Sequence, residues 1–122
     1  LICDYLALIY RRNMQVTVNI DRPMDSFHPQ HKKLYYPVYY GYIEGIMGGD
    51  GEYQDAYVIG VDTPLSHFTG KVIAIIHRFN DNEDKWVVAP TSKTYTKKEI
   101  EHYVYFQEQF FEYEIEMMIP HF

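Results

Sequence analysis

The sequence has little cysteine, few basic residues and no long apolar run. Its single cysteine, Cys3, excludes a disulfide within these residues, so a reducing, cytoplasmic location is the simplest expectation. Lysine and arginine number 11 against 17 acidic residues, and a net charge of −6 counts against a nucleic-acid partner, which needs a basic face. No stretch approaches the roughly 18 apolar residues of a membrane-spanning helix, so we expect no membrane partner. The opening "LICDYLALIYRRN" runs from apolar to basic, the reverse of a signal peptide.

Apolar and aromatic residues, by contrast, are plentiful. They make up 47% and 17% of the sequence, with tyrosine the commonest aromatic residue, and this composition favours a folded β-rich domain over disorder. The length of 122 residues fits a single domain, 1–122, with its own core. An acidic chain can still bind phosphate through metal ions, because carboxylates hold the metal and the metal holds the phosphate.

Hydrophobic periodicity predicts several strands. Segments rich in β-branched and aromatic residues, bounded by turn residues, are predicted to be strands. They are residues 14–20, 35–46, 55–61, 71–77 and 85–90. Pro37 interrupts the second segment, which suits an edge or a bulge. The fourth segment is apolar on both faces, so we expect it to be the central strand.

The pattern changes to that of a helix near the end. Residues 96–116 carry a wide apolar stripe, and Thr96 with Glu99 has the spacing of a capping box. A shorter helical extension is expected at about 1–13. The pattern predicts a mainly β (α+β) fold, a small antiparallel β-barrel with a C-terminal α-helix packed on it.

Two acidic turns stand out between the predicted strands. Their members are Asp50, Glu52 and Asp55 in "GGDGEYQDAYVIGV", and Asp81, Glu83 and Asp84 in "NDNED". Asp and Gly are ordinary turn residues, but Asp55 opens an apolar strand, where a carboxylate without a partner is costly. If both turns met at one end of a barrel, their mutual repulsion would favour a hard cation such as Mg²⁺. On the residues alone, ordinary turns and a cation site both stay open.

Three longer stretches resemble a known family. They are "YYPVYYGYIEGIMGGDGEYQDAYVIGV", "GKVIAIIHRFNDNEDKWVVAP" and "YFQEQFFEYE", which span most of residues 14–116. Together they resemble the soluble, metal-dependent inorganic pyrophosphatases of the single-domain barrel type, of which this chain looks like a short, divergent member. The resemblance implies an OB-like barrel with a helix, Mg²⁺ as cofactor with Mn²⁺ as a substitute, and hydrolysis of pyrophosphate to two phosphates.

The resemblance also implies residue roles. The family motif Asp-x-Asp-x-x-Asp is matched by Asp50-Gly51-Glu52-Tyr53-Gln54-Asp55, with Glu52 in the middle position, nearest the attacking water, and therefore as the catalytic base. The implied metal ligands are Asp50, Asp55, Asp81 and Asp84. Tyr40 and Lys85 match family residues that contact the substrate. We add Arg78 as a candidate phosphate contact, with a surface salt bridge to Glu83 or Asp84 as an equal alternative.

Several charged residues of the family, cations among them, are missing here. Thr17 and Asn19 occupy the positions of a lysine and a glutamate, and the family's Tyr-Lys pair becomes Phe110-Phe111 or, in another register, Tyr113-Glu114. Without these cations a phosphoanhydride depends on metal ions for charge balance. The pattern therefore predicts Mg²⁺ binding together with slow turnover.

Alternative functions stay open on the sequence. The first is a catalytically degenerate module of the same fold that binds metal and a phosphate-containing ligand or a protein partner. The second alternative is an oligonucleotide-binding barrel, and the net charge counts against it. His28 and His31 in "HPQH" are candidates for a zinc site or for a replacement phosphate contact. The apolar tail "MMIPHF" suggests packing against a second copy in a homo-oligomer.

Overall fold

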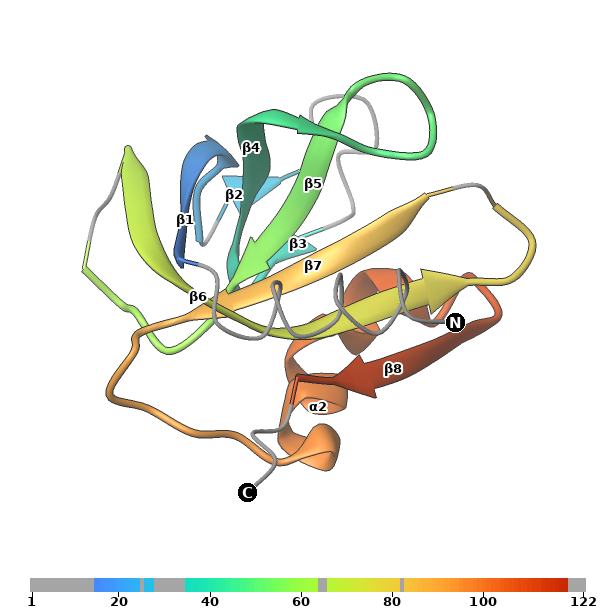
Figure 1. Cartoon of the computed structure of the whole chain (residues 1–122). Helices are drawn as coiled ribbons and strands as arrows, with labels where there is room; N and C mark the ends of the chain where they lie inside the picture. Colours follow the sequence, from blue (N-terminus) through green and yellow to red (C-terminus); the bar gives the residue numbers. More distant parts are fainter. Residues whose placement is uncertain (1–14, 25, 28–34, 64–65, 82, 119–122) are drawn as a thin grey trace.

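Six strands form one sheet, and five of them close into a barrel (Figure 1). The computed structural model describes residues 15–24, 26–27, 35–63, 66–81 and 83–118. The sheet order is β1-β4-β5-β7-β6-β8, and β1 also pairs with β6, which closes the barrel. The strands are β1 (Gln15–Arg22), β4 (Tyr39–Met47), β5 (Tyr53–Val58), β6 (His67–Arg78), β7 (Asp84–Ala89) and β8 (Tyr113–Met117). A separate pair joins β2 (Ser26–Phe27) to β3 (Tyr35–Tyr36).

The structure confirms the predicted mainly β fold, an OB-like barrel with a helix packed near it. One pairing differs from the antiparallel expectation, because β5 and β7 run parallel. Although β5 and β6 are consecutive, β7 lies between them in the sheet, and a strand order of this kind is not visible in local periodicity. The predicted central strand is confirmed, since β6 pairs with β1, β7 and β8.

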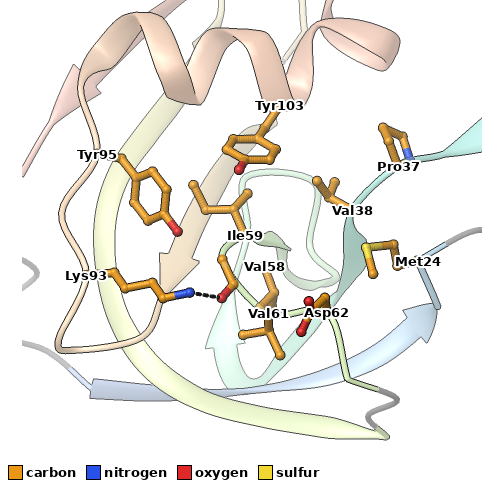
Figure 2. Close-up of a pocket in the computed structure, with 11 residues that line it drawn as sticks. Met24, Pro37, Val38, Val58, Ile59, Val61, Asp62, Lys93, Tyr95 and Tyr103 are labelled. Carbon is orange, nitrogen blue, oxygen red and sulfur yellow. Dashed lines mark hydrogen bonds between the residues drawn. The ribbon is translucent and has the colours of Figure 1, made fainter.

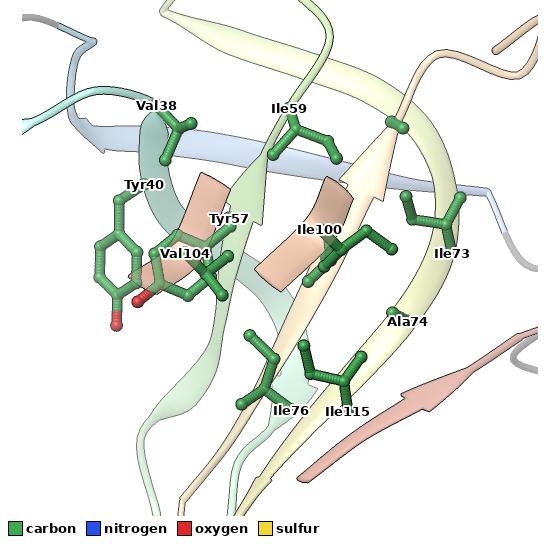
Figure 3. Packing of buried hydrophobic residues seen from close by; sticks show 12 residues of the cluster. Val38, Tyr40, Tyr57, Ile59, Ile73, Ala74, Ile76, Ile100, Val104 and Ile115 are labelled. Carbon is green, nitrogen blue, oxygen red and sulfur yellow. The ribbon is translucent and has the colours of Figure 1, made fainter. Parts of the chain in front are cut away.

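Strand alternation separates the buried side chains into two clusters. On β5, Ala56 and Val58 belong to one cluster, and Tyr57 to the other. The first cluster draws on alternate positions of all five barrel strands and fills the barrel interior. The second lies between the outer barrel face and the helix, where Ile100 and Val104 pack against strand residues (Figure 3). The helix therefore packs on the outer face of the barrel.

The helix α2 (Lys97–Glu108) begins as the sequence predicts. The Thr96 hydroxyl accepts a hydrogen bond from the Glu99 N–H at 3.1 Å, and the Glu99 carboxylate accepts one from the Thr96 N–H at 2.8 Å. This capping box satisfies two backbone donors that the first helical turn would otherwise leave without partners.

The predicted end of this helix, at residue 116, is wrong. The helix ends at Glu108, and Tyr113–Met117 forms β8 along the edge of β6, with Ile115 opposite Ile76. Ile115 continues the helical stripe in sequence, but Tyr113, Ile115 and Met117 also alternate as a strand does. The open edge of β6 decides between the two patterns, because it offers a row of backbone partners.

Three further expectations concern the chain ends and the loop before β3. The helical extension at 1–13 and the residues His28 and His31 lie outside the described residues. Met118 is buried within the barrel-interior cluster of its own chain. The prediction that the apolar tail packs against a second copy is therefore wrong for this residue. Among the described residues, no helix is long and apolar enough to cross a membrane.

Candidate active site

The two acidic turns meet at Lys85 on the outer face of the barrel. Because β5 and β7 are parallel with Ala56 opposite Trp86, Asp55 and Lys85 are lateral neighbours. The Lys85 Nζ donates to Asp55 Oδ2 at 2.5 Å and to Glu83 Oε2 at 3.3 Å. Its side chain is only 4% exposed, so the ammonium group is held between two carboxylates with little access to water. The partner that Asp55 needs is therefore a lysine of β7, just after the second turn.

Tyr40 forms one wall beside this lysine. The phenol ring lies edge-on to Tyr57 at 5.0 Å, with Lys85 Nζ 5.7 Å and Arg22 Cζ 5.2 Å from its centroid. Burial raises the pKa of Tyr40 well above its usual value, and Lys85 opposes that rise. Burial by itself would lower the pKa of Lys85, but its electrostatic interactions and hydrogen bonds with Tyr40 and Asp55 together raise that pKa above its usual value. Lys85 is therefore a permanent cation at neutral pH.

The carboxyl groups of the two turns are in direct contact at a second point. Asp50 and Glu83 share a side-chain hydrogen bond, which lowers the pKa of Asp50 and raises that of Glu83. When the two carboxyl groups share a proton, Glu83 is therefore the residue that holds it. Each turn is also closed locally, because Asp50 Oδ1 accepts from the Glu52 N–H at 3.0 Å and Asp81 Oδ1 accepts from the Glu83 N–H at 3.2 Å. Glu52 itself is exposed to solvent.

Arg78 is buried beneath the second turn. Its Nε and one terminal nitrogen donate to the two carboxylate oxygens of Glu108 at 2.9 and 2.6 Å. The other terminal nitrogen lies 3.5 Å from Asp81 and 3.8 Å from Glu83. The guanidinium carbon Cζ also lies 3.7 Å from the ring centroid of Phe111. The ion pair to Glu83 that was considered as an alternative is therefore present, although Arg78 is buried and not at the surface. Arg78 also joins the acidic turn to the end of α2.

Glu108 is the residue that the sequence analysis missed. It has no exposed surface, and it accepts a hydrogen bond from the Tyr57 hydroxyl at 2.7 Å in addition to the two from Arg78. Gln107 Nε2 in turn donates to the Tyr57 hydroxyl at 2.7 Å. A sequence signal existed, because Glu108 follows Ile100 and Val104 at steps of four on the apolar stripe of the helix. A carboxylate on a buried helix face requires a cationic partner.

Asp84 is not brought to this group. Successive strand residues point to opposite faces, so Asp84 faces away from Lys85, and its Oδ2 lies 3.2 Å from His77 Nδ1. His77 Nε2 lies 2.8 Å from Glu116 Oε1 on β8. The structure thus gathers Tyr40, Asp50, Asp55, Lys85 and, through Arg78, Asp81. It adds Glu83, which was not among the predicted ligands.

The oxygen donors of Asp50 and Glu83 fit a hard cation. Mg²⁺ in proteins is often held by one or two carboxylates, with water and substrate phosphates completing its shell. Two carboxyl groups that can share a proton form a place where a cation could take the position of that proton. Within the described ranges, no group of three or more His, Cys, Asp or Glu side chains is arranged to hold one ion.

A separate cavity of about 290 Å³ lies elsewhere, beside the end of β5 (Figure 2). Tyr95 and Tyr103 line it at 6.1 Å between ring centroids, and Lys93 Nζ donates to the carbonyl of Gly60 at 2.8 Å. Val58, Ile59 and Val61 contribute apolar surface. None of the predicted site residues lines this cavity, so it is distinct from the acidic group at Lys85.

The fold built around this group is that of known bacterial enzymes. The structure of an inorganic pyrophosphatase from Ehrlichia chaffeensis matches with a TM-score of 0.65 at 16% identity, over 87% of each chain. An inorganic pyrophosphatase from Neisseria gonorrhoeae matches with a TM-score of 0.57 at 16% identity, over 80% of this chain and 73% of that one. One from Coxiella burnetii gives a TM-score of 0.57 at 12% identity, over 84% of each chain.

These similarities define a pyrophosphatase-like fold for the chain. Comparisons with protein-family models and with curated proteins give no match. At identities of 12–17% the structural neighbours show the fold alone.

Proposed function

We propose that this chain is an Mg²⁺-dependent inorganic diphosphatase with slow turnover. The observation that carries the proposal is the meeting of the two acidic turns at Lys85, where Asp55 and Glu83 lie 2.5 and 3.3 Å from its Nζ. The pyrophosphatase-like fold supports it, since the same turns carry the motif on which the sequence resemblance rests.

The chain's own residues suggest a division of labour. Asp50 and Glu83 are the carboxyl groups best placed to hold Mg²⁺, with Asp55 beside them. The chemistry that bound Mg²⁺ supplies is neutralisation of phosphate charge and a lower pKa for the attacking water. Glu52 is proposed to accept the proton of that water, and its backbone is fixed by the bond to Asp50. Lys85 and Tyr40 are proposed to bind and orient the phosphate groups.

Slow turnover follows from how the cations are already paired. Lys85 is bound to Asp55 and Glu83, so a phosphate must compete with two carboxylates for it. Arg78 donates to Glu108 through Nε and one terminal nitrogen. Only its other terminal nitrogen faces Asp81 and Glu83. Glu52 also has one methylene more than the family's aspartate, and small misplacements of a base are costly in rate.

The test is phosphate release from pyrophosphate in the presence of Mg²⁺. The proposal expects wild type to exceed Asp55→Asn by at least about a hundredfold, because this substitution removes a carboxylate that the proposal places beside the Mg²⁺ ion. Asp62→Asn is the matched control, since Asp62 is an exposed aspartate beside the separate cavity. Equal, background-level rates in wild type and Asp55→Asn would overturn the enzymatic proposal.

The second candidate function is a binding module without turnover. The observation that favours it is the bidentate pairing of Arg78 with buried Glu108, which neutralises a cation that an active enzyme would direct at phosphate. Calorimetric titration with Mg²⁺ and then with methylenediphosphonate, which cannot be hydrolysed, separates the candidates. Tight binding of both without phosphate release favours the module, and absence of Mg²⁺ binding contradicts both.

A further inference from the structure

An aromatic surface continues directly from the proposed phosphate site. Tyr53 and Asp55 are two positions apart on β5 and therefore face the same side, about 7 Å apart along the strand. The Tyr53 ring stacks on Tyr42 with 5.8 Å between centroids and 10° between planes. Tyr42 is the residue opposite Asp55 across the β4–β5 pair, so the stack lies beside the Asp55 carboxylate.

One side of this stack is open to solvent. Tyr53 is 42% exposed, and its register partner Met47 is exposed as well. We call Tyr42, Tyr53 and Met47 the aromatic ledge. Its side chains carry no charge, while the adjoining group holds Lys85, Asp55 and the Asp50–Glu83 pair. A planar apolar surface and a phosphate-binding group thus follow one another on a single face of the sheet.

This arrangement exceeds what pyrophosphate can use. Pyrophosphate is wholly anionic and has no apolar part to place on the ledge. A ligand that joins a planar ring to a diphosphate would occupy both surfaces, because aromatic side chains stack any nucleobase through its π-face. We propose that the site takes a nucleoside diphosphate, with its base on the open face of Tyr53 and its diphosphate at Lys85. This inference rests on the proposed function and names a wider substrate class for it.

The reaction on such a ligand is hydrolysis of its terminal phosphoanhydride. The water oxygen forms a bond to the terminal phosphorus, and the bond from that phosphorus to the bridging oxygen breaks. The bridging oxygen leaves with the electron pair on the nucleoside monophosphate. Water gives up its proton, which passes through Glu52 to solvent, and orthophosphate is the second product. No oxidant, reductant or further co-reactant is needed.

A binding experiment tests the ledge independently of turnover. Calorimetry in Mg²⁺ compares α,β-methylene adenosine diphosphate with methylenediphosphonate, which share one non-hydrolysable bridge and differ by the nucleoside. We expect Tyr53→Ala to weaken nucleotide binding about tenfold or more, as the loss of a stacking aromatic side chain does in proteins that bind single-stranded nucleic acid. Diphosphonate binding should stay within twofold of wild type. Tyr53→Phe keeps the ring and should bind the nucleotide as wild type does.

Matched controls separate recognition from folding. Tyr105→Ala removes a similarly exposed tyrosine, 53% accessible on α2, and should change neither affinity. A urea unfolding midpoint for Tyr53→Ala close to that of wild type shows that the variant is folded. Equal effects of Tyr53→Ala on both ligands, no effect on either, or no binding of either analogue to wild type would overturn the inference.

Phosphate release distinguishes this inference from the proposed function. If wild type releases phosphate from neither pyrophosphate nor adenosine diphosphate, the proposed diphosphatase activity is contradicted. The binding comparison still decides whether the aromatic ledge binds a nucleoside. If wild type hydrolyses both, Tyr53→Ala should lower kcat/KM for adenosine diphosphate about tenfold and leave pyrophosphate hydrolysis unchanged. An equal loss of kcat/KM on both substrates would contradict nucleotide recognition by the aromatic ledge and would leave the proposed diphosphatase activity intact.

Discussion

Glu108, the last residue of α2, accepts two hydrogen bonds from Arg78 of β6 at 2.6 and 2.9 Å and has no surface exposed to water. The negative end of the helix dipole makes this an unfavourable place for a carboxylate. The Arg78 guanidinium and the Tyr57 hydroxyl offset that cost. Because Arg78 also faces Asp81 and Glu83, the pair connects the helix to the acidic turn of the proposed site.

We predict that Glu108→Ala destabilises the protein by about 3–5 kcal/mol, because it leaves a buried guanidinium without its partner. Replacing both members together, with Glu108→Leu and Arg78→Met, should recover most of the loss. Urea unfolding measures both variants. Glu112→Gln, an exposed acid nearby, is the control and should stay within about 0.5 kcal/mol of wild type. A cost for Glu108→Ala as small as that of the control would show that the pair contributes no net stability.

Lys85→Met should lower the rate of phosphate release from pyrophosphate about a hundredfold or more, since it removes the cation closest to Asp55. The matched control is Lys93→Met, which removes an exposed lysine of the separate cavity. Steady-state kinetics at saturating Mg²⁺ measures both. If the two variants lose the same amount of activity, Lys85 has no special role toward substrate.

Mg²⁺ affinity should rise with pH through the raised pKa of Glu83. The hydrogen bond that protonated Glu83 donates to Asp50 favours the protonated form of Glu83. The stability that this bond contributes is therefore present below the ordinary pKa of 4.5 and is lost as pH rises through the raised value. A cation that replaces the shared proton therefore binds better above that value. At pH values near or below it, the cation releases a proton on binding.

Calorimetry in two buffers of different ionisation enthalpy, at several pH values above 4.5, measures the proton release. Glu83→Gln cannot lose this proton, so it should show weaker binding without proton release at any pH. A pH-independent affinity in the wild type would contradict the assignment of Asp50 and Glu83 as the cation site.

Gly60→Ala should destabilise the chain more than Gly45→Ala. Both glycines have a positive φ, +83° and +87°, so either substitution costs roughly 1–2 kcal/mol in backbone strain. A Cβ at Gly60 would also overlap the Tyr95 hydroxyl, whereas one at Gly45 meets open space. Unfolding midpoints measure the difference, and adding Tyr95→Phe to Gly60→Ala should recover part of it. Equal costs at the two positions would show that backbone strain alone accounts for both.

The sequence by itself determined the strands and the start of the helix. Alternation of β-branched residues placed the barrel strands to within a few residues, and the Thr96–Glu99 spacing located the capping box. These are local properties, because a strand period, a turn and a cap each depend on residues a few positions apart. Local patterns also marked the two acidic turns that contain Asp50 and Asp55, whereas Lys85 was assigned to the same group only through the family resemblance.

The tertiary structure decided how these local pieces are paired. It ended α2 at Glu108 and made Tyr113–Met117 a strand, because the edge of β6 supplied backbone partners that the sequence does not show. It set β5 parallel to β7, which brought Asp55 to Lys85, and it turned Asp84 to His77 on the opposite face. Glu108 found Arg78 across 30 residues of sequence. Pairings over such distances depend on strand order and burial, and these are fixed only when the whole barrel has closed.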